Sequence, residues 1–101
     1  MAWKSPHFPS QCELHDPILR FLKNNGGTIV LYWHKQQLLA SLALQFQVSA
    51  AALDLRTRDG RESLFWNHVR NSKRALVARG WIESPAYGCW RLTESGIEAI
   101  A

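Results

Sequence analysis

A long amphipathic segment that ends at a glycine and runs directly into two short strands restricts the folds open to this chain. Residues 63–79 place apolar side chains at helical spacing, and Gly80 stands where helices commonly end. Residues 81–83 and 89–92 are rich in apolar and aromatic side chains, and the segment between them contains a proline and a glycine. This order predicts a helix followed by a two-stranded hairpin.

The preceding residues predict further helices and one strand. Asp16 suits the N-cap of a helix and Pro17 its first position, and we expect this helix to end within residues 24–27, Asn-Asn-Gly-Gly. We also expect a strand over 28–32, a helix over 34–47, a short helix over 50–53 capped by Ser49, a polar loop over 56–61 and a final helix over 94–100 capped by Thr93.

These elements define the predicted fold class, which is mainly α with a small β-hairpin, arranged as a winged helix-turn-helix. The 101 residues suffice for one domain with one core. We assign residues 1–12, which contain Pro6 and Pro9 and show no periodicity, to an extended N-terminal arm, and residues 13–101 to the winged-helix domain. Two cysteines do not make a disulfide framework, and no apolar run reaches about 18 residues, so we expect a reduced, cytoplasmic chain.

The positive charge is concentrated in one stretch. The chain carries a formal net charge of +4, whereas residues 56–79 contain seven basic and two acidic residues and the remainder carries −1. Six of the seven basic residues are arginine, whose planar guanidinium suits phosphates and guanine edges. A solvated helix face is the plain alternative, but such an excess repels itself unless a polyanion relieves it.

The helix predicted over 63–79 has two chemically different faces. One side is apolar or small and is expected to face the core: Phe65, Val69, Ser72 and Leu76. The opposite side, which we call the polar stripe, carries two arginines and two asparagines: Asn67, Arg70, Asn71 and Arg74. In a DNA major groove, arginine pairs with guanine and asparagine with adenine. The pattern therefore predicts binding of double-stranded DNA through this helix.

The candidate DNA contacts extend beyond the stripe. We expect the polar stripe to contact base edges and neighbouring phosphates, and four further cations to hold the DNA backbone: Arg58, Arg61, Lys73 and Lys35. Tyr87 lies at the expected hairpin tip and is a further candidate contact. Either Trp66, expected to be partly exposed, or Tyr87 is a candidate contact for the methyl group of 5-methylcytosine. Trp81 and Trp90 are expected in the core, and His68 on the helix surface.

Other chemistry has little support in the sequence. Cys12 and His15 have the spacing of half a zinc site, which His7 and Cys89 would have to complete. A buried thiol and a surface imidazole explain them better, because no second closely spaced pair exists. We find no nucleophile in a glycine-flanked turn and no glycine-rich phosphate loop. We therefore expect no catalytic residue, metal or cofactor.

Three stretches together carry a family resemblance. They are Asp16-Pro17-Ile18-Leu19 with Asn25-Gly26-Gly27, the run from residue 67 to the Trp81-Ile82-Glu83-Ser84-Pro85 segment, and Gly88-Cys89-Trp90-Arg91-Leu92-Thr93-Glu94-Ser95-Gly96. Over roughly residues 14–97 the chain resembles the winged-helix N-terminal domain of Mrr-type, modification-dependent restriction endonucleases. It departs from that pattern at Asn71 and Ser72, where the family usually has Trp and Ala.

The resemblance implies a prokaryotic module that delivers DNA, including methylated DNA, to a nuclease. This chain has no Asp followed by a downstream Glu-x-Lys of the kind such nucleases use, so the chain itself is not expected to be an enzyme. It is then either one domain of a larger protein that contains a nuclease domain, or a free-standing transcriptional regulator, which would dimerise on a palindrome. A winged helix that binds protein through its aromatic residues is the alternative from another class, and weak salt dependence would identify it.

Overall fold

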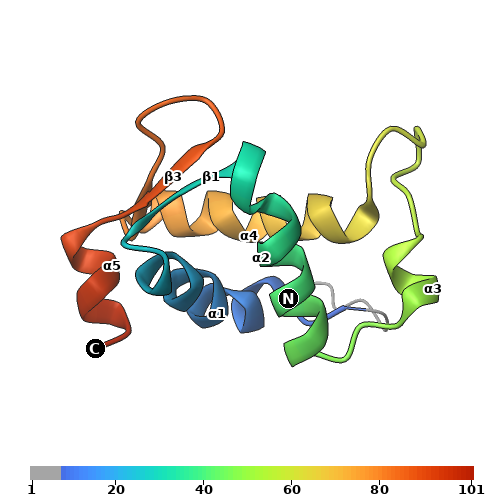
Figure 1. Ribbon diagram of the computed structural model, residues 1–101, viewed down its shortest axis with the longest axis horizontal. Helices are drawn as coiled ribbons and strands as arrows, with labels where there is room; N and C mark the ends of the chain where they lie inside the picture. The colour runs from blue at the N-terminus through green and yellow to red at the C-terminus, as the bar shows by residue number, and fades with distance from the viewer. Residues whose placement is uncertain (1–7) are drawn as a thin grey trace.

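The computed structural model describes residues 8–101, which form five helices and one three-stranded sheet, with the short helix over 50–53 at the end of the molecule away from the sheet (Figure 1). The elements follow in the order α1 (Gln11–Asn24), β1 (Thr28–Val30), α2 (Leu31–Gln45), α3 (Ala50–Leu53), α4 (Leu64–Ala78), β2 (Ile82–Glu83), β3 (Cys89–Leu92) and α5 (Glu94–Ala99). None of the helices in this part of the chain is long and apolar enough to cross a membrane.

The sheet combines a strand from the N-terminal half of the chain with the C-terminal hairpin. Its strand order is β1-β3-β2 with both pairings antiparallel, so the hairpin of β2 and β3 is extended by a strand from the N-terminal half. Ile29 lies opposite Trp90, and Ile82 opposite Leu92. Helix α4 leads directly into this hairpin, and α3 interrupts the connection from α2 to α4 (Figure 1). The arrangement is a winged helix-turn-helix, as predicted, with residues 84–88 as the wing.

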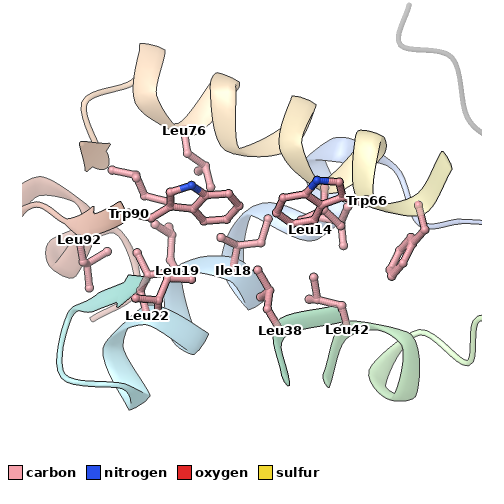
Figure 2. Packing of buried hydrophobic residues seen from close by; sticks show 14 of the residues in the cluster. Leu14, Ile18, Leu19, Leu22, Leu38, Leu42, Trp66, Leu76, Trp90 and Leu92 are labelled. Atoms are coloured by element: carbon pink, nitrogen blue, oxygen red, sulfur yellow. The ribbon is translucent and has the colours of Figure 1, made fainter. Parts of the chain in front are cut away.

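The core lies between α1, α2, α4 and the sheet. Leu14, Ile18 and Leu22 of α1 are all fully buried, as are Leu38 of α2 and Leu76 of α4. Figure 2 shows these side chains converging below α4. Each fully buried side chain of this size contributes roughly 1.5–3 kcal/mol. The core therefore holds α4 firmly by one face.

Both ends of α4 are fixed by local sequence. The Ser63 hydroxyl accepts a hydrogen bond from the Trp66 N–H at 3.2 Å, which caps the first turn. At the other end Gly80 has a φ of 76°, and the Trp81 N–H donates to the Leu76 carbonyl at 3.0 Å. Such a turn favours glycine because the left-handed conformation strains residues with a Cβ. The predicted helix over 63–79 is thus confirmed to within one residue at each end.

The start of α1 differs from the sequence-based expectation. The helix begins at Gln11, not at Asp16, because the Ser10 hydroxyl accepts from the Glu13 N–H at 3.1 Å and forms the cap. Pro17 lies inside the helix and donates no backbone hydrogen bond there. The fully buried Leu14 and Ile18, on either side of Pro17, offset that loss.

The predicted arm over residues 1–12 is also too long. Residues 11 and 12 belong to α1, and Phe8 is buried against Phe65 with a ring centroid separation of 5.3 Å. Packing of an aromatic side chain onto α4 is a tertiary contact that the irregular local sequence does not indicate. Residues 1–7 lie outside the described part of the chain.

The remaining boundaries are close to those expected. The strand expected over 28–32 ends at Val30, since the backbone becomes helical at Leu31, so α2 begins before the expected residue 34. The Leu31 N–H still donates to the Gly88 carbonyl at 2.8 Å. The short helix α3 and the final helix α5 begin after their predicted caps, Ser49 and Thr93, each of which accepts a backbone hydrogen bond at 3.1 Å.

Candidate nucleic-acid interface

The inner face of α4 is committed to packing, as the sequence predicts. Phe65 is 1% exposed, and Val69, Ser72 and Leu76 are fully buried. The Ser72 hydroxyl donates to the Gln11 carbonyl at 2.7 Å, which satisfies its only polar group and ties α4 to the start of α1. The polar stripe is therefore turned away from the core.

The polar stripe is a connected set of side chains. Asn71 donates to Asn67 at 3.3 Å, and Asn67 donates to the Glu62 carboxylate at 2.8 Å. Arg70 donates to the same Glu62 oxygen at 3.2 Å, and Arg74 lies 3.5 Å from the Asn71 amide oxygen. The four predicted residues are thus brought together, and they bond mainly to one another and to Glu62.

Glu62 is a residue of this face that the sequence analysis did not single out. It lies directly before the cap Ser63, and its carboxylate is the acceptor on which Asn67 and Arg70 converge. The available signal was an acidic residue at the start of the most basic helix in the chain. Its reach to residues five and eight positions later depends on the path of the backbone into α4.

Like charges crowd along the outer side of α4. Burial, and then the charges of Arg74 and Arg70, lower the pKa of Lys73 below its ordinary value. The Lys73 ammonium lies 5.5 Å from the centre of the Trp90 ring. Each cation on this side therefore raises the free energy of its neighbours, and a polyanion that binds there relieves the repulsion.

The loop before α4 adds exposed arginines next to the stripe. Asp59 shapes this loop, since its carboxylate accepts from the Thr57 hydroxyl at 2.6 Å and from the Arg61 N–H at 3.0 Å, and these bonds lower its pKa. A shallow pocket of about 620 Å³ is bordered by Arg58, Arg61, Glu62 and Asn67 among others. The predicted backbone contacts Arg58 and Arg61 thus adjoin the start of the polar stripe.

Lys35 reaches the same region from α2. A cleft of about 520 Å³ between α2, α3 and α4 is lined by Lys35, Arg56 and Arg61. Within residues 8–101, none of these three cations forms an ion pair with a carboxylate. Lys35, Arg61 and Arg58 therefore border two adjoining hollows that share Arg61, whereas Lys73, the fourth predicted backbone contact, lies further along α4 over Trp90.

Trp66 does not have the exposure that the sequence suggested. It is only 5% exposed, and its ring stacks on that of Trp90 with a centroid separation of 5.9 Å and an interplanar angle of 4°. The Lys35 ammonium lies 4.5 Å from the ring centre (the two rings appear in Figure 2). Side chains from β3 and α2 thus enclose Trp66. The ring is not available to a methyl group at the surface, which leaves Tyr87 as the candidate.

The exposed aromatic residues are elsewhere. Tyr87, at the tip of the wing, is fully exposed, as predicted. Tyr32 and Trp33 at the start of α2 are 89% and 69% exposed, and their rings meet edge to face at 5.6 Å. The sequence analysis did not propose Tyr32 or Trp33 as contacts. The hydrogen bond from Leu31 to Gly88 joins the start of α2 to the base of the wing.

Three further aromatic side chains near α4 and the hairpin are buried or half-buried. Trp90 is buried as predicted, and Trp81 is half-buried against the core with the Arg79 guanidinium 5.0 Å from its ring. His68 is not a surface residue: it is 8% exposed, and its Nε2 donates to the Pro9 carbonyl at 2.7 Å. The segment before α1, which covers this part of α4, accounts for that burial.

The half zinc site finds no further ligands in the described part of the chain. Over residues 8–101, no three His, Cys, Asp or Glu side chains gather where they could hold a metal ion, and His7 lies outside that range. Cys12 is an exposed free thiol and not the buried thiol that the sequence suggested. His15 is 8% exposed rather than a surface imidazole, and burial followed by the charge of Arg79 lowers its pKa.

The fold and the outer face of α4 together define a winged-helix domain with a basic, asparagine-containing surface helix. The chain matches the model of the Mrr N-terminal domain over residues 12–101, and it belongs to this family. This membership links the chain to restriction systems. The matched model describes an N-terminal domain, and no nuclease domain is matched. Comparisons with curated proteins and with solved structures give no match.

Proposed function

We propose that this domain binds double-stranded DNA and serves as the specificity module of a modification-dependent restriction endonuclease. The observation that carries the proposal is the polar stripe of α4, which faces away from the core beside the exposed Arg58 and Arg61. In helix-turn-helix proteins the second helix of the motif enters the major groove. Helix α4 holds that place in this fold.

The residues divide by the part of DNA that they would contact. Asn67, Arg70, Asn71 and Arg74 would face base edges and the nearest phosphates, whereas Lys73, Arg58, Arg61 and Lys35 would hold the backbone. Tyr87 at the wing tip would lie over the backbone or in a minor groove. Tyr87 is also the remaining candidate for contact with the methyl group of 5-methylcytosine.

Two other functions make different demands. A free-standing regulator with this fold would bind unmodified DNA and form a homodimer on a palindromic site. A protein-binding domain would use the exposed Tyr32, Trp33 and Tyr87, and its affinity would hardly depend on salt. The restriction proposal, in contrast, includes a nuclease domain as partner, a cytoplasmic location and a response to DNA methylation.

Fluorescence anisotropy distinguishes these functions. One CpG-containing duplex would be titrated in unmodified, hemimethylated and fully methylated forms, each at two salt concentrations. Four backbone cations give an expected slope of log affinity against log salt of about −3 to −4. Tighter binding of the methylated forms at both salts supports the proposal, and equal binding of all three favours a regulator. No binding at low salt would rule out DNA as the ligand.

A further inference from the structure

We propose that Glu62 and Arg70 together recognise neighbouring cytosine and guanine edges in the major groove. The Glu62 carboxylate would accept from the cytosine N4 amino group, and the Arg70 guanidinium would donate to guanine O6 and N7. The inference rests on the proposed function, because it names the base pairs that the same face of α4 would select.

The position of Glu62 places it among residues that enter a groove. It directly precedes Ser63, the cap of α4, and the N-terminal residues of a recognition helix are those that contact base edges. The side chains of Glu62 and Arg70 are 28% and 38% exposed, so both can reach a partner at the surface. Their bonded atoms are 3.2 Å apart, which restricts their targets to adjacent edges.

A carboxylate on a DNA-binding face is repelled by the phosphates. It therefore favours DNA sequences whose base edges offer it hydrogen-bond donors. Among the major-groove edges, cytosine presents the N4 donor without an N7 acceptor, whereas adenine combines a donor and an acceptor and suits asparagine. Glu62 can only accept when ionised, and Asn67 beside it can do both. The Glu62 carboxylate, which can only accept, therefore suits the cytosine edge better than the adenine edge.

Arg70 bonds to Glu62 through one of its two terminal nitrogens. Within residues 8–101, only its terminal NH2 nitrogen forms a side-chain hydrogen bond, to Glu62, whereas its Nε is buried and faces the protein, so a ligand would be met by the terminal nitrogens. A guanidinium offers two parallel N–H groups that match guanine O6 and N7. In the proposed complex, the guanidinium and the carboxylate would exchange some of their mutual contact for contacts with guanine and cytosine.

Selection from a pool of random duplexes tests the inference with three variants. The protein should enrich duplexes with adjacent cytosine and guanine. Glu62→Gln should lose the cytosine preference at least fivefold while it binds random DNA equally or more tightly, because a negative charge is removed. Arg70→Lys keeps the positive charge but removes the two parallel N–H donors of the guanidinium, and it should lose the guanine preference. Glu83→Gln, at an exposed carboxylate paired with Arg91 on the hairpin, is the matched control and should change neither.

The outcomes separate the two proposals. Unchanged base preferences in Glu62→Gln, or a site without cytosine and guanine, would overturn this inference and leave DNA binding intact. Failure of the unaltered protein to retain any duplex at low salt would overturn the proposed function and the inference with it. Thermal unfolding of each variant shows whether the fold is kept. Because Arg70→Lys reports on guanine separately, loss of fold in one variant leaves the other as a test.

Discussion

The two faces of α4 differ in how their side chains are held. On the inner face, Val69, Ser72 and Leu76 are fully buried and have one set of neighbours. On the outer face, the side chains bond mainly to one another around Glu62 and are partly exposed. The inner contacts stabilise the fold, whereas the outer contacts can be exchanged for those of a ligand. Substitutions on the two faces should therefore affect different measurements.

The largest effect is expected from the inner face. Leu76→Ala removes a fully buried side chain and should lower the free energy of unfolding by about 2–5 kcal/mol, measured by urea denaturation. Val77→Ala, at the next and 40% exposed position, is the control and should change it by less than about 1 kcal/mol. Equal losses at both positions would contradict the assignment of the two faces.

A smaller effect on a different quantity is expected from the outer face. Arg74→Ala should weaken DNA binding by about 1–3 kcal/mol if its guanidinium contacts a base, measured by anisotropy. The free energy of unfolding should hardly change, because Arg74 is exposed and its side chain forms only one long hydrogen bond within residues 8–101, 3.5 Å to Asn71. Unchanged affinity on every duplex tested would remove Arg74 from the interface.

The loop before α4 should contribute charge without sequence preference. Arg58→Ala is expected to weaken binding to all duplexes alike and to reduce the salt slope by about 1, because one phosphate contact is lost. Arg20→Ala, on α1 and paired with Asp16, is a suitable control for net charge. A change in which sequences are preferred, rather than a uniform loss, would place Arg58 at a base edge instead.

The smallest effect concerns pH and a residue far from the polar stripe. Burial, followed by Arg79, lowers the pKa of His15 in the folded state, so the unfolded chain binds the proton more readily. The contribution of His15 to stability should therefore fall as pH decreases below about 6.5, the ordinary histidine pKa. Urea denaturation at pH 5 and 7 should show a smaller pH dependence for His15→Gln than for the unaltered protein. An identical pH dependence would assign the effect to other groups.

The sequence predicted the parts of the fold that depend on local signals. The caps Ser49 and Thr93, the stop at Gly80 and the core-facing side of α4 all follow from residue type and helical spacing. The predicted start of α1 was wrong because both Ser10 and Asp16 are suitable N-cap residues. The burial of Leu14 favours the earlier start, with Ser10 as the cap.

The candidate site was predictable only in part. The polar stripe follows from the helical period, but the burial of Trp66 depends on Trp90 and Lys35, which come from other elements. The burial of His68 depends on the segment before α1. The role of Glu62 depends on how the loop enters α4. Contacts between elements, which one-dimensional patterns do not contain, account for each of these differences.

The most direct test of the account is to map the DNA-binding surface on the protein. Nuclear magnetic resonance spectra of the ¹⁵N-labelled domain would be recorded during titration with a short duplex. If the outer face of α4 binds DNA, the amide signals that shift will belong to the start and outer face of α4, the loop over residues 57–62 and the wing tip at Tyr87. Shifts confined to α1 and α5, or no shifts at low salt, would contradict the claim that the outer face of α4 binds DNA.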